Sequence, residues 1–409
     1  IGKAANGRGP RKSPGISVKL SAIHPRYDFA KYERVMEEIP AKLKALCLMA
    51  KKYDIGLTVD AEESERLDIS LDIIEKVFSD PDLDGWDGFG LAVQSYQKRA
   101  IFVIEWLRQL SLEVGRKMMV RLVKGAYWDT EIKHTQQGGF DDFPVFTRKT
   151  STDVSYHACA NRLLAYRDTI YPQFATHNAY SASVIIELAG DDKEGFEFQC
   201  LHGMGDSLYD QVVKKDNIQC RVYAPVGVHE DLLAYLVRRL LENGANSSFV
   251  NAIVDDNQPV ESLLEDPVER TQRLQVRENK QIAMPIDLYA PDRANSRGFD
   301  IYDVNATQDL SLRLDKWFEG HVKALENVKE AEGQILVRNP ARLSEIVGTH
   351  QMHSKAEMLA MLDRTTEAAK EWSQQSVEDR AGLLMRTADI LERHMDELIG
   401  LCIKEAGKI

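Results

Sequence analysis

The sequence lacks several features that mark particular classes of protein. Its five cysteines are scattered and form no C-x-x-C pair, so we expect reduced thiols and a cytoplasmic location. No uninterrupted apolar run reaches about 18 residues, which excludes a membrane-spanning helix but leaves peripheral contact with the inner face of a membrane open. The formal net charge of −12 argues against nucleic acid as a partner, because phosphate binding needs a concentrated basic surface.

Three catalytic signatures are also missing. No G-x-G-x-x-G segment opens a helix, as a doubly wound dinucleotide-binding fold would require. No G-x-S-x-G elbow supports a Ser-His-Asp hydrolase. The histidines lack the spacing of metal ligands, apart from His350 and His353, which have no neighbouring carboxylate ligand. We therefore predict no metal site.

Short β-like runs alternate with amphipathic helical stretches from Ser17 to Gly244, which is typical of a parallel sheet covered by helices. There are seven runs, at 17–21, 57–61, 89–94, 119–124, 174–177, 196–201 and 221–224. The helical patterns between them include 32–52, 97–114, 158–171 and 230–242. A closed barrel would gather the residues that end these runs around one mouth: Lys19, Asp60, Gln94, Arg121, His177, Leu201 and Tyr223. We predict an α/β fold, a (βα)8 TIM-like barrel whose first strand precedes Ile1.

The rest of the chain predicts two further parts. We assign residues 1–251 to the barrel, 252–330 to a linker with short helices, and 331–409 to the start of a second α/β domain. That second part has a strand at 335–340 and amphipathic helices at 355–370 and 377–404. The chain opens without an initiator Met and stops inside this domain, so we expect it to be a piece of something longer.

One helix face is a candidate for binding a carboxylate. Tyr235, Arg238, Arg239 and Glu242 are spaced i, i+3, i+4, i+7 and share that face. Two guanidinium groups suit a carboxylate, and Glu242 can hold the Arg238 side chain in place. The alternative is a solvent-facing stripe of ion pairs.

A second candidate lies after the fourth run. Arg121 and Lys124 end the run, Gly125 allows close backbone approach, and Tyr127 and Trp128 follow. This arrangement suits a flat, electron-rich ring, because a nearby cation stabilises the charge the ring gains on reduction. The alternative is a strand–loop junction with aromatic side chains in the core and Arg121 in a salt bridge.

Three other candidates carry less information. We expect Asp60 to pair with Lys19, with a helix N-cap role as the alternative. His177 is more typical of a hydrogen-bonded structural group than of a ligand. Cys200 is a weak candidate for a nucleophile, because its run resembles a buried strand.

Together these segments resemble a known family. The motifs lie at 17–27, 60–63, 121–128, 176–178, 200–203 and 235–239. They are similar to the proline dehydrogenase domain of the bacterial bifunctional proline utilisation (PutA) family, over residues 1 to about 251. The tail from about residue 335 resembles the amino-terminal part of an aldehyde dehydrogenase.

The resemblance implies an FAD-containing barrel that oxidises L-proline to Δ1-pyrroline-5-carboxylate. Hydride would pass from proline C5 to flavin N5, and electrons would continue to a membrane quinone. In the full-length protein, a homo-oligomer, the aldehyde dehydrogenase part would use NAD to oxidise glutamate semialdehyde to glutamate. The alternatives are a non-catalytic or DNA-binding regulatory role, and a barrel enzyme that acts on another amino acid with pyridoxal phosphate or a metal.

The resemblance also implies roles for individual residues. Lys19, Arg238 and Arg239 would hold the proline carboxylate. Tyr235, Tyr223 and Leu201 would pack on the proline ring, with Asp60 organising the cluster and Tyr127 among the catalytic residues. The flavin pocket would comprise Asp60, Gln94, Arg121, Val123, Lys124, Gly125, Ala126, Tyr127, Trp128, Thr147, Arg148, Lys149, Thr176, His177, Asn178, Cys200, Leu201 and Glu242.

Overall fold

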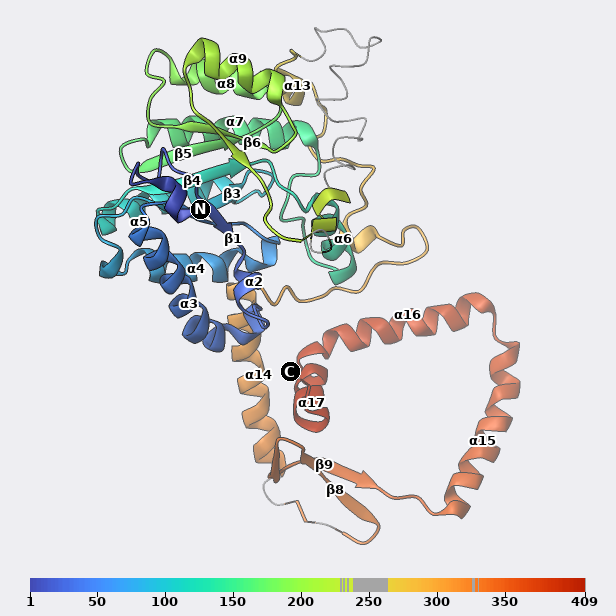
Figure 1. Ribbon diagram of the computed structural model, residues 1–409. Coiled ribbons are helices and arrows are strands. Elements are labelled where there is room, and N and C mark those ends of the chain that lie inside the picture. Colours follow the sequence, from blue (N-terminus) through green and yellow to red (C-terminus); the bar gives the residue numbers. More distant parts are fainter. Residues whose placement is uncertain are drawn as a thin grey trace. The chain divides into compact units, whose positions relative to one another are not determined.

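The protein divides into two compact units, Ile1–Tyr302 and Asp303–Ile409 (Figure 1). The computed structural model describes residues 1–228, 230, 232–233, 235–237, 264–325, 328–329 and 331–408. Arg238, Arg239 and Glu242 lie outside the described residues, as does most of the helix predicted at 230–242.

The first unit is built on a parallel sheet, which confirms the predicted α/β architecture. Its strands pair in chain order, each parallel to the next. The strands are β1 (Ile16–Val18), β2 (Leu57–Val59), β3 (Phe89–Gln94), β4 (Met118–Val123), β5 (Ile170–Ala175), β6 (Glu197–Leu201) and β7 (Cys220–Tyr223). Because the strands are parallel and sequential, all their C-terminal ends meet at one edge.

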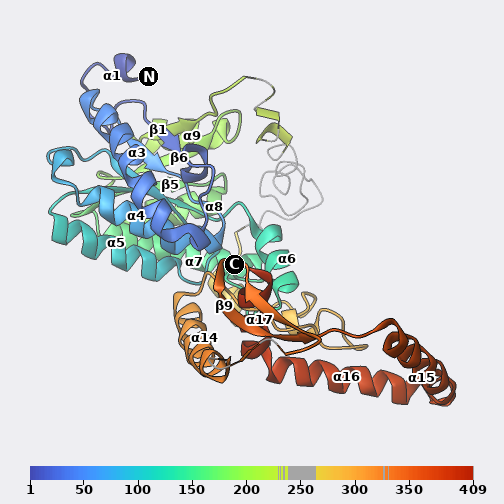
Figure 2. The same cartoon turned by 90° about the horizontal axis from the view of Figure 1, so that it is seen from below.

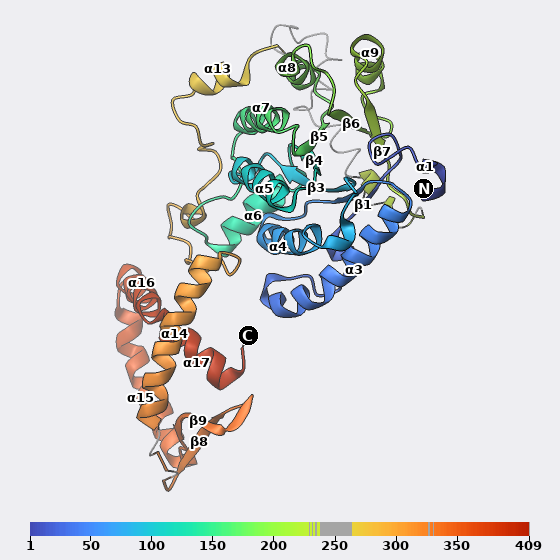
Figure 3. The same ribbon diagram turned by 90° about the vertical axis from the view of Figure 1, so that its left-hand side faces the viewer.

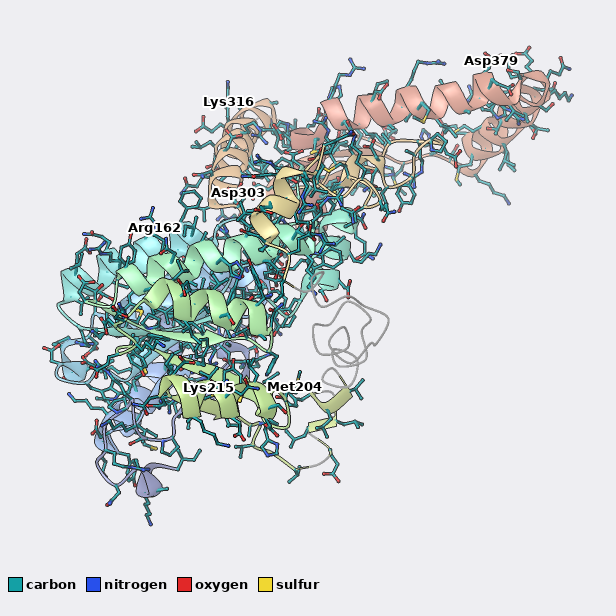
Figure 4. All side chains as sticks on the ribbon, turned by 90° about the horizontal axis from the view of Figure 1, so that it is seen from above. Arg162, Met204, Lys215, Asp303, Lys316 and Asp379 are labelled. Carbon is teal, nitrogen blue, oxygen red and sulfur yellow. The ribbon has the colours of Figure 1, made fainter. Side chains whose placement is uncertain are left out.

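Helices cover the outside of this sheet (Figure 3). The main ones are α3 (Tyr32–Lys52), α4 (Leu67–Phe78), α5 (Ala100–Val114), α7 (Lys149–Ala165), α8 (Ala179–Ala189) and α9 (Asp206–Asp216). Figure 4 marks Arg162 on α7 and Lys215 on α9, two helices of this outer layer. In α3, Val35, Ile39, Leu43 and Cys47 recur every four residues and are fully buried, so one apolar stripe holds the helix against the sheet.

Short helices complete the described connections of the first unit. They are α1 (Gly2–Ala5), α2 (Leu20–Ile23), η1 (Phe29–Lys31), η2 (Ser64–Arg66), η3 (Pro81–Leu83), α6 (Trp128–Gly138), α13 (Pro267–Gln272) and η4 (Pro285–Asp287). One of them, α2, begins inside the run 17–21 that predicts a single strand.

Side-chain contacts between distant strands show that the sheet curls on itself. Arg121 in β4 donates to Ser17 Oγ in β1 at 2.8 Å, although β2 and β3 lie between those strands. At the other edge, Arg221 Nη2 in β7 donates to the carbonyl of Arg11 at 2.9 Å, shortly before β1. The first contact requires β4 to approach β1 across the interior, and the second requires the last strand to approach the segment before the first, as in a barrel.

The interior of this curled sheet is polar, whereas barrels are usually filled by branched aliphatic side chains. Alternate residues of β6 face opposite sides. Phe196 and Phe198 pack in the core beneath the helices, while Glu197 and Gln199 are buried on the other face. Buried polar groups must be paired with one another to be tolerated. The interior therefore holds a hydrogen-bonded network.

The fifth strand differs from the sequence prediction. Strand β5 begins at Ile170, four residues before the predicted run at 174–177, and α7 ends at Ala165, where 158–171 was predicted. Pro172 and Gln173 lie inside β5, and both residue types weaken a strand pattern. The buried side chain of Gln173 donates a hydrogen bond to Glu197 Oε1 at 2.9 Å, which makes its burial tolerable. The local sequence pattern cannot reveal this partner, because it lies on the next strand.

Part of the region predicted as a linker packs on the first unit. Gln136 of α6 donates to the carbonyl of Ala283 at 2.8 Å, and Asn295 donates to the carbonyl of Gln136 at 3.0 Å. Ile282 and Met284 pack against an apolar cluster that includes Tyr96, Ile132, Phe143 and Val145. These contacts attach the segment around residues 282–295 to α6.

The second unit contains a hairpin and four helices among its described residues (Figure 2). They are α14 (Val304–Leu325), β8 (Gln334–Asn339), antiparallel β9 (Arg342–Gln351), α15 (Lys355–Gln374), α16 (Val377–Arg393) and α17 (Met395–Ala406). Helix α14 falls within the predicted linker, and its Arg313 pairs with Asp396 of α17 at 2.9 Å. None of the helices in the described part of the chain has the length and apolar character that crossing a bilayer requires.

Candidate active site

Arg121 is at the centre of the polar cluster inside the sheet. Its Nη1 donates to Asp60 Oδ1 at 2.5 Å and to Ser17 Oγ at 2.8 Å, and its Nε donates to Gln199 Oε1 at 2.7 Å. The residue is 9% exposed, so these charge-assisted bonds are shielded from water. The guanidinium group is therefore held from two sides at the C-terminal ends of the strands.

Tyr223, at the end of β7, lies against the same cluster. Its hydroxyl donates to Asp60 Oδ2 at 3.3 Å, and the Arg121 guanidinium carbon is 5.2 Å from its ring centroid. Burial, followed by the negative charge of Asp60, raises the pKa of Tyr223 to about 12, and Tyr235 adds a small upward effect. Tyr223 consequently keeps its proton at neutral pH, and the half-buried Tyr235 lies near it.

Lys19 contacts a different partner from the one expected. Its ammonium donates to Tyr127 Oη at 2.9 Å, whereas Asp60 forms its ion pair with Arg121. The predicted Asp60–Lys19 ion pair is therefore wrong. The reason is the curl of the sheet, which brings Arg121 from β4 across to β2.

The charge state of Lys19 follows from opposing effects. Burial lowers its pKa, but the hydrogen bond to Tyr127 and the negative charges of Glu62 and Asp60 together outweigh burial. The net result is a raised pKa, so Lys19 is a permanent cation at neutral pH.

Gln94 connects two neighbouring loops. Its Nε2 donates to the carbonyl of Glu62 at 2.8 Å, and its Oε1 accepts from the backbone N–H of Ala126 at 3.3 Å. Gly125 adopts a φ of +140°, and a Cβ at this position would collide with the ring of Tyr96. Only glycine suits this backbone position.

A second group of cations lies further along the predicted pocket. Lys124 forms an ion pair with Asp153. Burial lowers the pKa of Lys149, and the positive charges of Lys124 and Arg270 lower it further against the opposing effect of Asp153. Burial and then Lys124 likewise lower the pKa of His157. Burial is the first cause of both shifts, and Asp153 opposes each of them, so these cations share at least one carboxylate.

Thr147, Arg148 and Trp128 make backbone contacts. Thr147 Oγ1 accepts from the N–H of Asn279 at 3.0 Å, and Arg148 Nε donates to the carbonyl of Glu278 at 3.1 Å. Trp128 Nε1 donates to the carbonyl of Phe146 at 2.8 Å. The three side chains thus help to hold the loops around this region.

Residues 176–178 follow β5 and contact both α8 and the end of β6. Asn178 Oδ1 caps α8 by accepting from the N–H of Ser181 at 3.0 Å, and Thr176 Oγ1 accepts from the N–H of Asn178 at 3.1 Å. His177 Nε2 accepts from the N–H of Leu201 at 3.0 Å. The segment therefore joins the ends of β5 and β6. The described residues contain no group of three or more possible metal ligands.

Cys200 belongs to the core beneath the helices. Its sulfur lies 3.7 Å from Cys220 Sγ in β7, and the hydrogen bond from Cys220 lowers the pKa of the Cys200 thiol. The side chain therefore faces away from the polar interior that contains Glu197 and Gln199, although Leu201 follows it at the strand end.

Comparison with known proteins shows the family of the chain. The sequence model of proline dehydrogenase matches residues 1–252, and that of the aldehyde dehydrogenase family matches residues 327–409. The chain belongs to the proline dehydrogenase family. The resemblance seen in its motifs is thereby confirmed.

Individual relatives extend the likeness. The bifunctional protein PutA of Salmonella typhimurium is 48% identical over 427 residues, covering 100% of this chain and 32% of the relative. Proline dehydrogenase 1 of Bacillus subtilis subsp. natto is 28% identical over 211 residues, covering 51% of this chain and 61% of the relative. A crystal structure of a bifunctional proline utilization A (PutA) protein is 44% identical with a TM-score of 0.86, covering 100% of this chain and 39% of that chain. The chain spans about a third of the length of the PutA relatives.

Several residues of the cluster escaped the sequence analysis. Ser17 and Gln199 both bind Arg121, and Glu197 binds Gln199. Ser17 and Gln199 each lie two positions before a residue predicted at the barrel mouth, Lys19 and Leu201. This spacing is the signal that could have revealed them, since alternate residues of a strand share one face.

Gly125→Ala is expected to destabilise the protein by about 1–3 kcal/mol, because it combines a disfavoured φ with a collision. The collision involves Tyr96, so the loop after β4 should also shift. Urea denaturation measures the first effect, and the amount of flavin retained measures the second.

Gly115→Ala provides the control. Gly115 ends α5 with a φ of +69° and open space around its missing Cβ. It should cost about 1–2 kcal/mol of stability but leave flavin content unchanged. If the Gly125→Ala variant retained as much flavin as the Gly115→Ala control, the expected shift of the loop after β4 would be contradicted.

Proposed function

We propose that this chain binds FAD at the C-terminal ends of its strands and oxidises L-proline to Δ1-pyrroline-5-carboxylate. The observation that carries the proposal is the cluster of the buried Arg121 with the half-buried Asp60 and Tyr223, with the cationic Lys19 nearby. Barrel enzymes place their catalytic groups at this edge of the sheet. Membership of the proline dehydrogenase family supports the choice of substrate.

The residues present suit a flavin nucleotide. Gly125 lets the loop after β4 pack against the ring of Tyr96. Lys124 and Lys149 place two cationic side chains near Asp153, and they would bind the phosphates of the nucleotide. Thr150 Oγ1 is buried without a hydrogen-bond partner among the described residues. Gln94, Arg121 and the stretch Val123–Trp128 would hold the ring, while 147–149, 176–178, Leu201, Asp60 and the predicted Glu242 would complete the pocket; the side chain of Cys200 lies in the core. When bound, the flavin supplies the acceptor for the hydride that leaves proline C5.

The protein's own contribution is mainly positioning. Lys19 would bind the proline carboxylate together with Arg238 and Arg239, and Tyr127 would keep Lys19 in place. Tyr223, Tyr235 and Leu201 would pack on the ring.

Lys19 and Tyr223 retain their protons near neutral pH, so neither can accept the amine proton. Proline is therefore expected to react with a neutral amine. The nitrogen lone pair then assists the departure of hydride from C5.

Two pH dependences should differ as a result. The kcat/KM for proline should rise with pH as the amine loses its proton. Binding of a five-membered ring carboxylic acid without an amine should stay constant from pH 7 to about 10, since the raised pKa keeps Lys19 charged there. The raised pKa also stabilises the folded protein below the ordinary lysine pKa, and this contribution disappears as pH rises through the folded-state value.

Tyr127→Phe tests why the pKa of Lys19 is raised. It removes the hydrogen bond that raises the pKa of Lys19, leaving burial as the largest single effect against Glu62 and Asp60. Affinity for the amine-free acid should then begin to fall at a lower pH than in the parent protein. Identical pH profiles in the two proteins would contradict the assignment.

The decisive experiment is anaerobic addition of L-proline to the purified protein supplied with FAD. We expect a yellow protein whose flavin absorption bleaches with L-proline and changes little with D-proline. A protein that binds FAD but is not bleached, or that binds no FAD, would overturn the proposal.

The longer relatives suggest the wider setting. A full-length protein would pass electrons to a membrane quinone, by peripheral contact from the cytoplasm, and would form homo-oligomers. Its aldehyde dehydrogenase part would use NAD to oxidise glutamate semialdehyde, since residues 327–409 match the start of that family.

A further inference from the structure

A chain of hydrogen bonds runs from Arg121 into the interior of the sheet. Arg121 Nε donates to Gln199 Oε1 at 2.7 Å, and Gln199 Nε2 donates to Glu197 Oε1 at 2.9 Å. Arg221 then donates to Glu197 from Nε at 2.7 Å and from Nη2 at 2.9 Å. Glu197 is fully buried and Gln199 is 3% exposed, so water cannot substitute for these partners.

The chemistry of the two neighbours allows only one orientation of the Gln199 amide. Arg121 can only donate, so the amide oxygen must face it. The Glu197 carboxylate can only accept, so the amide nitrogen must face Glu197. The reverse orientation would place donor against donor and acceptor against acceptor in a buried site.

Glu197 is itself fixed from the other side. Arg221 contacts both carboxylate oxygens, and its guanidinium group donates to the backbone carbonyls of Ser13 and Arg11. A guanidinium bound at several nitrogens cannot rotate without breaking several bonds. The segment before β1 thus fixes Arg221, Arg221 fixes the Glu197 carboxylate, and the carboxylate fixes the Gln199 amide.

This chain of hydrogen bonds fixes the orientation of the Arg121 guanidinium group. Ser17 and Asp60 bind Nη1, and the bond at Nε prevents the guanidinium plane from turning about that contact. The plane in turn lies against the ring of Tyr223. We propose that Gln199 and Glu197 are positioning residues for proline oxidation: they orient Arg121, and through it Asp60 and Tyr223, without touching the substrate. This inference rests on the function proposed above.

Gln199→Met removes the connection while keeping a side chain of similar length. Turnover per bound flavin should fall by about tenfold, since one charge-assisted hydrogen bond to Arg121 is lost. The KM for proline should change by less than about twofold, because Lys19 and its partner Tyr127 are untouched. The single-turnover rate of flavin bleaching by L-proline should fall as much as kcat.

Gln173→Met is the matched control. Gln173 donates to the same oxygen, Glu197 Oε1, at the same 2.9 Å from the neighbouring strand β5, and it is 2% exposed. It makes no hydrogen bond to Arg121. The control variant should therefore lose similar stability but keep kcat within about twofold of the parent.

A further variant covers the case in which Gln199→Met does not fold. Gln199→Asn keeps the amide but is one methylene shorter, so it cannot reach both partners, and its kcat per flavin should also fall with KM preserved. Parent-like kcat in either folded Gln199 variant, or equal losses in the Gln173 and Gln199 variants, would overturn the inference. Failure of the parent itself to bleach with L-proline would instead refute the proposed function.

Discussion

Arg121→Met is expected to lower kcat/KM for L-proline by about 10²–10³-fold, the scale seen when a preorganised charged donor is removed from an active site. Arg121 neutralises Asp60 at 2.5 Å and packs on Tyr223. Without it, the half-buried Asp60 carboxylate has no ion-pair partner among the described residues, and the cluster loses its geometry. Steady-state kinetics normalised to bound flavin would measure the loss.

Arg116→Met separates this effect from simple loss of a buried arginine. Arg116 lies just before the same strand, at its opposite end, and is 6% exposed. It donates to the carbonyl of Phe78 at 2.6 Å and pairs with Asp84, outside the proposed site. This variant should be less stable but should retain kcat/KM per flavin. A decrease below about tenfold for Arg121→Met would contradict a catalytic role.

Glu197→Leu is expected to reduce the free energy of unfolding by about 3–5 kcal/mol, because it removes a fully buried carboxylate and leaves the partly buried Arg221 guanidinium without its partner. Arg221 donates to Glu197 twice, and Gln173 and Gln199 donate to the same carboxylate. Urea denaturation at one fixed flavin concentration would measure the change, since ligand binding alters apparent stability.

The double replacement of Glu197 and Arg221 by leucine tests the cause. If the uncompensated charge dominates, removing both partners should restore part of the stability lost by Glu197→Leu. If the double variant loses more free energy of unfolding than the two single variants lose together, the loss arises from packing.

Much of the fold could be predicted because its signals are local. The helix predicted at 32–52 and the strand predicted at 89–94 have the same bounds in the structure. The run predicted for strand β5 starts four residues too late, because Pro172 and Gln173 interrupt the apolar pattern of the strand. Helix α14 was missed because its support is remote: Leu314 is buried in a unit where α14 packs against α17, about 80 residues later.

The sequence by itself determined which residues gather, since parallel strands that follow one another bring their C-terminal ends to one edge, and Lys19, Asp60, Arg121 and Tyr223 lie at or near those ends. Only the tertiary structure decided which of them pair. Arg121 reaches Asp60 and Ser17 because the sheet curls, and Lys19 is left to Tyr127. Pairing across two or three strands depends on curvature, and curvature results from the packing of the whole sheet and its helices.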